Sequence, residues 1–278
     1  MKLLVTAAAC AALTAGCVGA SSPVGAPALD PVFLNMVRAH GIEVDGDPVA
    51  RRLLAEYGSV FAAASVDLPP VVLFPDPAAL ERWQATVKTE RVRLGDVVAE
   101  LQRPAAEALR NALVEAGARG LTITARGKEG ASRRSYRQAS EFWAARVGPA
   151  VAHWQRKGRL SSQRAREILE APIGTQVRLV LKEEAGGLHF ATGFEKTILH
   201  SVAPPGASQH HTMLALDVVQ FDQRSVREIL ARHGWHQTVP SDLPHFTYLG
   251  LTGQQLESRG LTPVTVAGRV YWIPRTKE

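Results

Sequence analysis

The chain has 278 residues, with 32 lysines and arginines against 26 acids and a formal net charge of +6. Hydrophobic residues make up 46% and charged residues 21%, a balance typical of a globular protein with enough apolar side chains for one large domain or a domain with an extension. We interpret the positive charge as a solvated basic surface. The sequence has neither a zinc-finger spacing nor a basic run interleaved with aromatic residues, so it gives no indication of nucleic-acid binding.

Residues 1–17 are predicted to be a lipoprotein-type signal peptide. Lys2 supplies a positive start, and the apolar or small stretch that follows is too short to span a membrane. Residues 13–17 read LTAGC, which resembles the lipobox of bacterial lipoproteins, in which the cysteine, here Cys17, becomes the acylated first residue. The alternative is cleavage near this point by the general signal peptidase.

The lipobox resemblance implies an exported cell-envelope lipoprotein, held to a membrane by a lipid on Cys17. Val18 is not the aspartate that retains such proteins in the inner membrane, so the periplasmic face of an outer membrane is expected. Cys10 and Cys17 are the only cysteines and both lie in the signal segment. Any metal in the rest of the chain must therefore be held by histidine and carboxylate side chains.

Residues 18–30 are small and contain proline and glycine, which predicts a flexible tether. Residues 31–103 are predicted to be a mainly helical N-terminal region. Helical spacing of apolar residues extends over residues 47–63, a helix can begin at Pro77, and residues 71–74 could form a short strand.

Residues 104–278 are predicted to form an α+β domain, because helical and strand patterns mix there without regular alternation. A capping box at Ser225 and Glu228 indicates the start of one of the helices. Helices are expected over 104–116, around 143–154 with a kink at Pro149, over 162–171 and over 225–233; strands are expected over 121–124, 177–181, 213–219 and 245–249, with a last hairpin turning at residues 267–268.

Seven of the nine histidines fall in the last third of the chain, and two local patterns among them indicate chemistry. Residues 208–217 read SQHHTMLALD, which places His210 in a polar loop and Asp217 inside an apolar strand. A buried carboxylate costs several kcal/mol unless it is paired or binds a metal. Asp217 therefore needs a partner, and His210 could share a cation with it, with the adjacent His211 as an alternative.

The second pattern is DLPHFTY over residues 242–248, in which a histidine begins a strand three residues after an acid. Together the two patterns resemble the M15 family of zinc peptidases, whose fold is shared with the Hedgehog signalling domain. The family shows S-x-H-x-x-G-x-A-x-D followed by a short E/D-x-x-H element. The matching residues here are Ser208, His210, Ala215, Asp217, Asp242 and His245.

This resemblance covers roughly residues 120–250 and implies a Hedgehog/DD-peptidase-like α+β domain. Such a domain has a small central antiparallel sheet flanked by helices, here with the N-terminal mainly helical extension before it. It also implies a Zn²⁺ cofactor, since the family's members are zinc enzymes.

The resemblance assigns a role to each matched side chain. His210, Asp217 and His245 would be the zinc ligands, leaving the fourth tetrahedral position open as a catalytic zinc site requires. Asp242 would be the general base that takes a proton from the attacking water and passes it to the leaving amine. Ser208 would lie beside the substrate, hydrogen-bonded near the ligands.

An arginine that binds the substrate carboxylate or the developing oxyanion is also implied. Residues 132–138, SRRSYRQ, resemble an upstream S-x-x-R-S segment of the family, although the leading serine is one residue too close. We choose Arg134 because a serine and a tyrosine follow it. Arg126 and Arg137 remain alternatives.

The leading prediction is a zinc peptidase that cleaves D-amino-acid-containing peptidoglycan stem peptides, as a D-Ala-D-Ala carboxypeptidase or an endopeptidase. No protein partner is predicted. The alternative is a catalytically inactive envelope lipoprotein that binds peptidoglycan or a protein. Met213 in place of the family glycine and the altered arginine segment favour this alternative. Two further departures concern catalysis: Asp242 replaces the glutamate of the carboxypeptidase branch, although aspartate occurs in the endopeptidase-like branch, and residues 243–244 replace a tryptophan.

Overall fold

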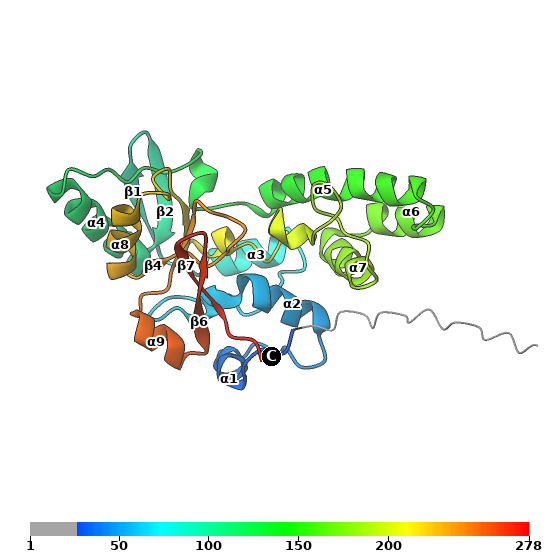
Figure 1. The fold of residues 1–278 in the computed structure, drawn as a ribbon, viewed down its shortest axis with the longest axis horizontal. Coiled ribbons are helices and arrows are strands. Elements are labelled where there is room, and N and C mark those ends of the chain that lie inside the picture. The colour runs from blue at the N-terminus through cyan, green and yellow to red at the C-terminus, as the bar shows by residue number, and fades with distance from the viewer. Residues whose placement is uncertain (1–26, 278) are drawn as a thin grey trace, which may run out of the picture.

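The computed structural model describes residues 27–277 (Figure 1). The predicted signal peptide, with Cys17, and most of the predicted tether lie outside the described residues. Within residues 27–277, no helix is both long enough and apolar enough to cross a membrane.

The N-terminal region begins with helices and ends in a β-hairpin. Each of its three α-helices starts at a proline behind an aspartate whose side chain accepts a backbone N–H, an arrangement that favours helix initiation. The hairpin is antiparallel, and the prediction of a mainly helical region missed it. The elements are α1 (Pro31–Ala39), α2 (Pro48–Tyr57), the 3-10 helix η1 (Gly58–Ala62), α3 (Pro77–Gln84), β1 (Thr89–Leu94) and β2 (Val97–Gln102).

The remaining elements mix helices with short antiparallel strands, so the predicted α+β class is confirmed. A three-stranded sheet has the order β3-β5-β4, and the predicted last hairpin is formed by β6 and β7. The elements are α4 (Arg103–Ala118), η2 (Glu129–Ala131), α5 (Tyr136–Arg156), α6 (Ser162–Glu170), α7 (Ile173–Ala185), η3 (Ile198–His200), η4 (Gln209–Thr212), β3 (Ala215–Asp217), α8 (Arg224–Arg232), β4 (Trp235–His236), β5 (His245–Tyr248), α9 (Gly253–Ser258), β6 (Leu261–Val266) and β7 (Arg269–Pro274).

Three predicted strands are wrong. Residues 177–181 lie in α7, because the buried side chains there are Val177, Val180 and Leu181, which is helical spacing, and not the alternating set that the sequence suggested. Residues 71–73 form bends, and residue 74 is irregular. Residues 121–124 have no regular secondary structure, and the next residue, Ala125, forms an isolated bridge to Val218.

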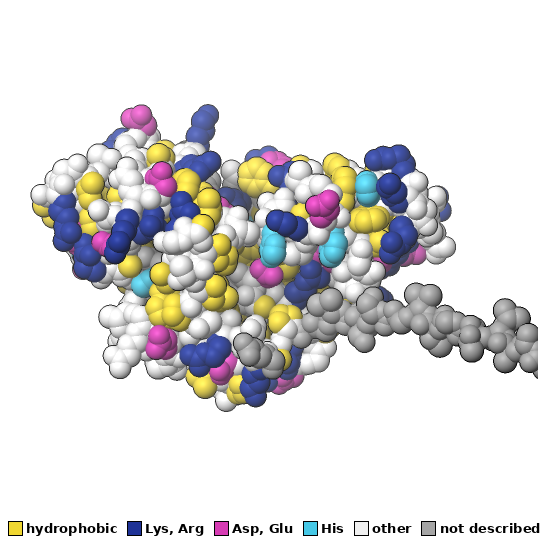
Figure 2. Space-filling model, in the orientation of Figure 1, with side chains coloured by type: hydrophobic (Ala, Val, Ile, Leu, Met, Phe, Trp, Pro, Cys, Tyr) yellow, Lys and Arg dark blue, Asp and Glu magenta, His cyan; other side chains and the backbone are white. Residues whose placement is uncertain are grey.

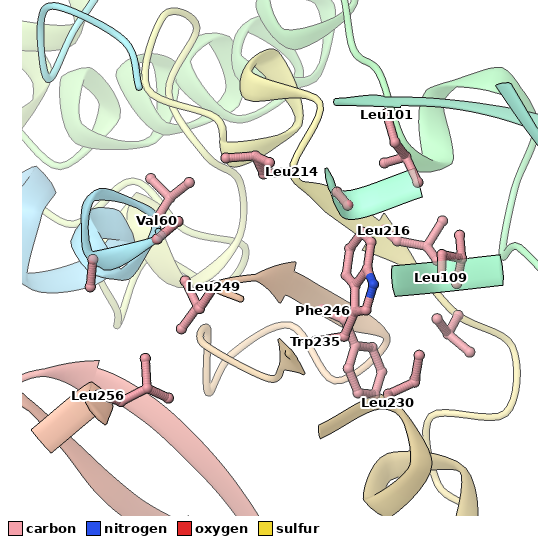
Figure 3. Close-up of a cluster of buried hydrophobic side chains, with 14 of the residues drawn as sticks. Val60, Leu101, Leu109, Leu214, Leu216, Leu230, Trp235, Phe246, Leu249 and Leu256 are labelled. Carbon is pink, nitrogen blue, oxygen red and sulfur yellow. The ribbon is translucent and has the colours of Figure 1, made fainter. Parts of the chain in front are cut away.

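Two hydrophobic clusters divide the molecule into two lobes. The sheet lobe contains the β3-β5-β4 sheet, and its core joins the N-terminal Val60 and Leu101 to Leu214, Trp235 and Phe246 (Figure 3). The N-terminal region therefore packs into the same core as the central sheet.

The helical lobe consists of α5, α6 and α7 with the loop up to residue 203. It extends from one side of the molecule, away from α4, β1 and α8 (Figure 1). Its core is built on Trp143, Val147 and Val151 of α5, joined by Leu53 and Tyr57 of α2. In the view of Figure 2, basic side chains are spread over both lobes with acids among them, consistent with a solvated basic surface.

Candidate metal centre

The β3-β5 register brings the predicted ligands together. Asp217 of β3 lies opposite His245 of β5 in the antiparallel pairing. Side chains alternate along a strand, so the neighbours Leu216 and Phe246 point into the sheet-lobe core while the two polar side chains share the other face. His210 comes from η4, the 3-10 turn just before β3.

The three predicted ligand atoms form a nearly regular triangle. His210 Nε2 lies 3.2 Å from His245 Nδ1. Asp217 Oδ1 lies 3.4 Å from His210 Nε2 and 3.3 Å from His245 Nδ1. Ligands bound tetrahedrally at zinc distances are separated by about 3.3 Å, so the three atoms fit the metal. Among the described residues, this is the one group of three such side chains close enough to hold a metal ion.

Gln209 orients His245. His245 Nε2–H donates to Gln209 Oε1 at 2.7 Å, which leaves Nδ1 unprotonated and directed at the other ligands. Thr247 Oγ1 donates to the same oxygen at 2.5 Å, and the Gln209 amide nitrogen donates to the Tyr57 carbonyl at 2.7 Å. A metal-binding imidazole commonly has such a partner on its second nitrogen. The sequence analysis missed Gln209, although its place between Ser208 and His210 was a signal.

The alternative ligand His211 is already fully hydrogen-bonded. Its Nδ1–H donates to the Arg134 carbonyl at 2.8 Å, and its Nε2 accepts the Gly206 N–H at 3.2 Å. Burial lowers the pKa of His211 to about 4. With both nitrogens in use, His211 holds the loop in place and has no lone pair to offer a metal.

The protonation states suit a cation. Burial by itself would raise the pKa of Asp217, but its contacts with the His210 and His245 rings hold that pKa well below its usual range. Burial lowers the pKa of His210, which keeps the imidazole neutral near pH 7. An ionised carboxylate and a neutral imidazole are the forms that bind zinc.

The ligand cluster opens into a pocket of about 290 Å³ between the two lobes. His210 and His245 line it together with the predicted Asp242, Arg134 and Ser208. A larger groove of about 950 Å³, on the surface of α8 and β7, contains none of these five side chains. The smaller pocket is therefore the one that the chemistry favours.

Of the three candidate arginines, Arg134 is the one in this pocket. Its Nη2 lies 3.6 Å from Asp217 Oδ2, and its guanidinium lies 5.4 Å from the Phe142 ring centre. The side chain of Arg137 is 82% exposed and pairs with Glu141. Arg126 stacks on Phe221, and neither of the two alternatives lines the pocket.

Asp242 and Ser208 occupy the pocket in different ways. Asp242 is exposed, and its backbone carbonyl accepts the His245 N–H at 3.2 Å, which fixes the turn that leads into β5. The Ser208 hydroxyl is buried and has no hydrogen-bond partner among the described residues, nor does Nδ1 of His210. The hydrogen bond predicted for Ser208 is therefore not formed.

Met213 occupies a left-handed backbone position, with φ of 54°. Glycine adopts this conformation without strain, whereas a side chain costs about 1–2 kcal/mol. The glycine of the family pattern is thus explained by the backbone. Met213 keeps the same turn, since its N–H still bonds to the His210 carbonyl and its side chain is fully buried.

No family model matches the chain, and no curated protein matches it. Among solved structures, it is similar to a glutamate-to-alanine variant of the vancomycin resistance D,D-pentapeptidase VanY in complex with Zn(II), with 18% identity, a TM-score of 0.31, and coverage of 60% of this chain and 82% of that one. It is also similar to VanYB in complex with D-Alanine-D-Alanine, at 19% identity and TM-score 0.32, covering 60% and 80% of the two chains.

A third similar structure is the LdcB LD-carboxypeptidase, described with the basis of its peptidoglycan recognition. The identity is 14%, the TM-score is 0.36, and the match covers 80% of this chain and 90% of that one. Because the identities and TM-scores are this low, these three likenesses carry no argument about function.

Proposed function

We propose that the chain is a zinc-dependent peptidase that hydrolyses D-amino-acid-containing stem peptides of peptidoglycan, as a carboxypeptidase or an endopeptidase. The observation that carries the proposal is the triangle of His210, Asp217 and His245, with ligand-atom separations of 3.2 to 3.4 Å at the wall of a pocket. The substrate class comes from the resemblance of the two sequence patterns to the M15 peptidases.

Zinc, when bound, would supply a Lewis acid that polarises the scissile carbonyl and makes water more acidic. The chain's own residues would do the rest. Asp242 would accept the proton of the attacking water and deliver it to the leaving amine. Arg134, on the opposite wall, would stabilise the negative charge that develops on the carbonyl oxygen. Gln209 would keep His245 in the tautomer that binds metal.

The Asp242→Ala variant tests catalysis separately from metal binding. We expect hydrolysis of a D-Ala-D-Ala peptide to fall by about 100- to 10,000-fold, the usual contribution of a general base, while zinc content is unchanged. Ser241→Ala, which alters the neighbouring pocket residue, should keep most of the activity. Undiminished turnover in Asp242→Ala would remove the role proposed for this residue.

The competing proposal is a noncatalytic module that keeps the metal cluster and binds peptidoglycan or a protein. Met213 in a glycine position and the unpaired Ser208 hydroxyl favour it. Purified sacculi incubated with the zinc-loaded chain distinguish the two functions. Released D-alanine or new peptide fragments support the peptidase, whereas retention of the chain on sacculi without released products supports the binding module.

We further propose that the chain is exported and anchored to the outer membrane through a lipid on Cys17. The support is the lipobox-like sequence LTAGC over residues 13–17. Cells that express the chain should incorporate labelled palmitate into it, and Cys17→Ala should abolish the label. A Cys17→Ala chain that still carries the label would refute acylation at this position.

A further inference from the structure

Arg146 is a second arginine in the pocket that holds the metal ligands. Phe142, Ala145 and Arg146 lie on one side of α5, three and four residues apart, and all three line the pocket beside His210 and His245. Arg146 Nε–H donates to Ser201 Oγ at 2.8 Å, so the loop that closes the helical lobe fixes the plane of the guanidinium.

The charge of Arg146 is not offset by any acid of the described chain. Two other basic side chains that line the pocket each lie near an acid. Arg134 is 3.6 Å from Asp217, and His200 is 3.7 Å from Glu56. Arg146 forms no ion pair with a described residue, and its one side-chain hydrogen bond is to a neutral hydroxyl.

The terminal nitrogens of Arg146 are therefore available to a ligand. A guanidinium presents its N–H groups as a planar fork that matches the two oxygens of a carboxylate. The acidic side chain that lines the pocket is Asp242, which would repel a carboxylate from the sheet-lobe side, whereas the second lining arginine, Arg134, already lies 3.6 Å from the Asp217 carboxylate. A peptide carboxylate would thus be directed towards α5.

We propose that Arg146 binds the free C-terminal carboxylate of the substrate peptide, and that the site consequently selects peptides ending in an acid over amidated or cross-linked ones. This inference rests on the proposed peptidase function and specifies it as a carboxypeptidase. The pocket volume of about 290 Å³ agrees, because it is at the small end of ligand sites and suits the end of a peptide.

The test is the binding of N-acetyl-D-Ala-D-Ala and of its C-terminal amide to the zinc-loaded full chain, measured by calorimetry with Asp242→Ala to prevent turnover. We expect the acid to bind about 10- to 100-fold more tightly than the amide, because a hydrogen-bonded charge pair is lost with the amide. Arg146→Gln should abolish this preference by weakening only the acid.

Arg137→Gln is the matched control, since Arg137 lies on the same helix but outside the pocket, paired with Glu141. It should keep the preference for the acid. If Arg146→Gln fails to fold, Ser201→Ala removes the hydrogen bond that orients Arg146 and should reduce the preference in part.

Equal binding of acid and amide by the parent, binding of neither, or a preference that survives Arg146→Gln would overturn the proposal. The outcome is distinguishable from failure of the peptidase function. A chain that hydrolyses peptides without preferring the acid remains a peptidase and loses this subsite. A chain that prefers the acid through Arg146 without hydrolysing it keeps the subsite and loses catalysis.

Discussion

The two walls of the pocket are held in place by different means. On the sheet-lobe wall, Asp217 and His245 are short side chains on paired strands, and the hydrogen-bonded register fixes their positions. On the opposite wall, the long side chain of Arg146 comes from α5, and that of Arg134 from the segment just before this helix, whose own core is elsewhere, around Trp143. The comparison suggests that the sheet lobe holds a metal in rigid geometry, while the helical lobe supplies charge that can adjust to a substrate.

The largest expected effect is on zinc affinity, which should depend on the sheet-lobe wall and not on the opposite wall. Asp217→Ala should weaken zinc binding by about 100-fold or more, because one of three ligands is lost. Arg134→Gln, on the opposite wall, should leave the affinity unchanged or raise it, since a cation 3.6 Å from the Asp217 carboxylate is removed. Competition with a chromophoric chelator measures both. Equal losses in the two variants would contradict a division of roles between the walls.

The next effect concerns the pH dependence of the metal-free chain. The pKa of His211 falls from an ordinary 6.5 to about 4 in the folded state, so between these values the unfolded state binds more protons. Stability should therefore rise with pH through this window and be lost as pH falls, by about 3 kcal/mol from this side chain.

Urea unfolding in chelator at several pH values measures that slope. His211→Gln cannot titrate and should flatten the curve between pH 6.5 and 4. A variant curve as steep as that of the parent would show that the acid sensitivity arises elsewhere.

A smaller effect is expected behind the sheet-lobe wall. Gln209→Leu removes the acceptor that holds His245 Nε2–H, and should reduce zinc affinity by about 10- to 100-fold. Gln209→Glu keeps an acceptor oxygen and should retain more of the affinity. If the Gln209→Leu and Gln209→Glu variants bind zinc as tightly as the parent does, Gln209 has no orienting role.

The smallest effect is a comparison of two substitutions at Met213. Both Met213→Ala and Met213→Gly lose a buried side chain, but only glycine relieves the left-handed backbone, at φ of 54°. The glycine variant should therefore be the more stable of the two by about 1 kcal/mol, the reverse of the usual order. Thermal or urea unfolding decides, and a more stable alanine variant would contradict the backbone explanation for the family glycine.

The sequence predicted the sheet-lobe side of the pocket best, because its residues are close in the chain. The spacing from His210 to Asp217 and the acid before His245 are local patterns, and Asp217 and His245 lie on two short, paired strands. The opposite side depends on contacts that sequence spacing does not encode. Arg146 meets the pocket only because the loop with Ser201 packs against α5.

The fold was predicted less completely for a related reason. The hairpin β1-β2 was missed because charged side chains separate its buried apolar residues, which are Val92 and Leu94 in β1 and Ala99 and Leu101 in β2. The strand expected over residues 177–181 is a helix because tertiary packing buries Val180, which lies between the apolar residues that suggested alternation. In both places burial in the assembled core decided the structure, and local pattern did not.

The measurement that tests the central claim most directly is the zinc content per chain, by elemental analysis of the purified protein beside His210→Ala and His245→Ala. The account predicts about one zinc in the parent and its loss in both variants, each shown to be folded by circular dichroism. A parent that stays metal-free after zinc is offered, or variants that keep their zinc, would contradict the assignment of this cluster as a metal centre.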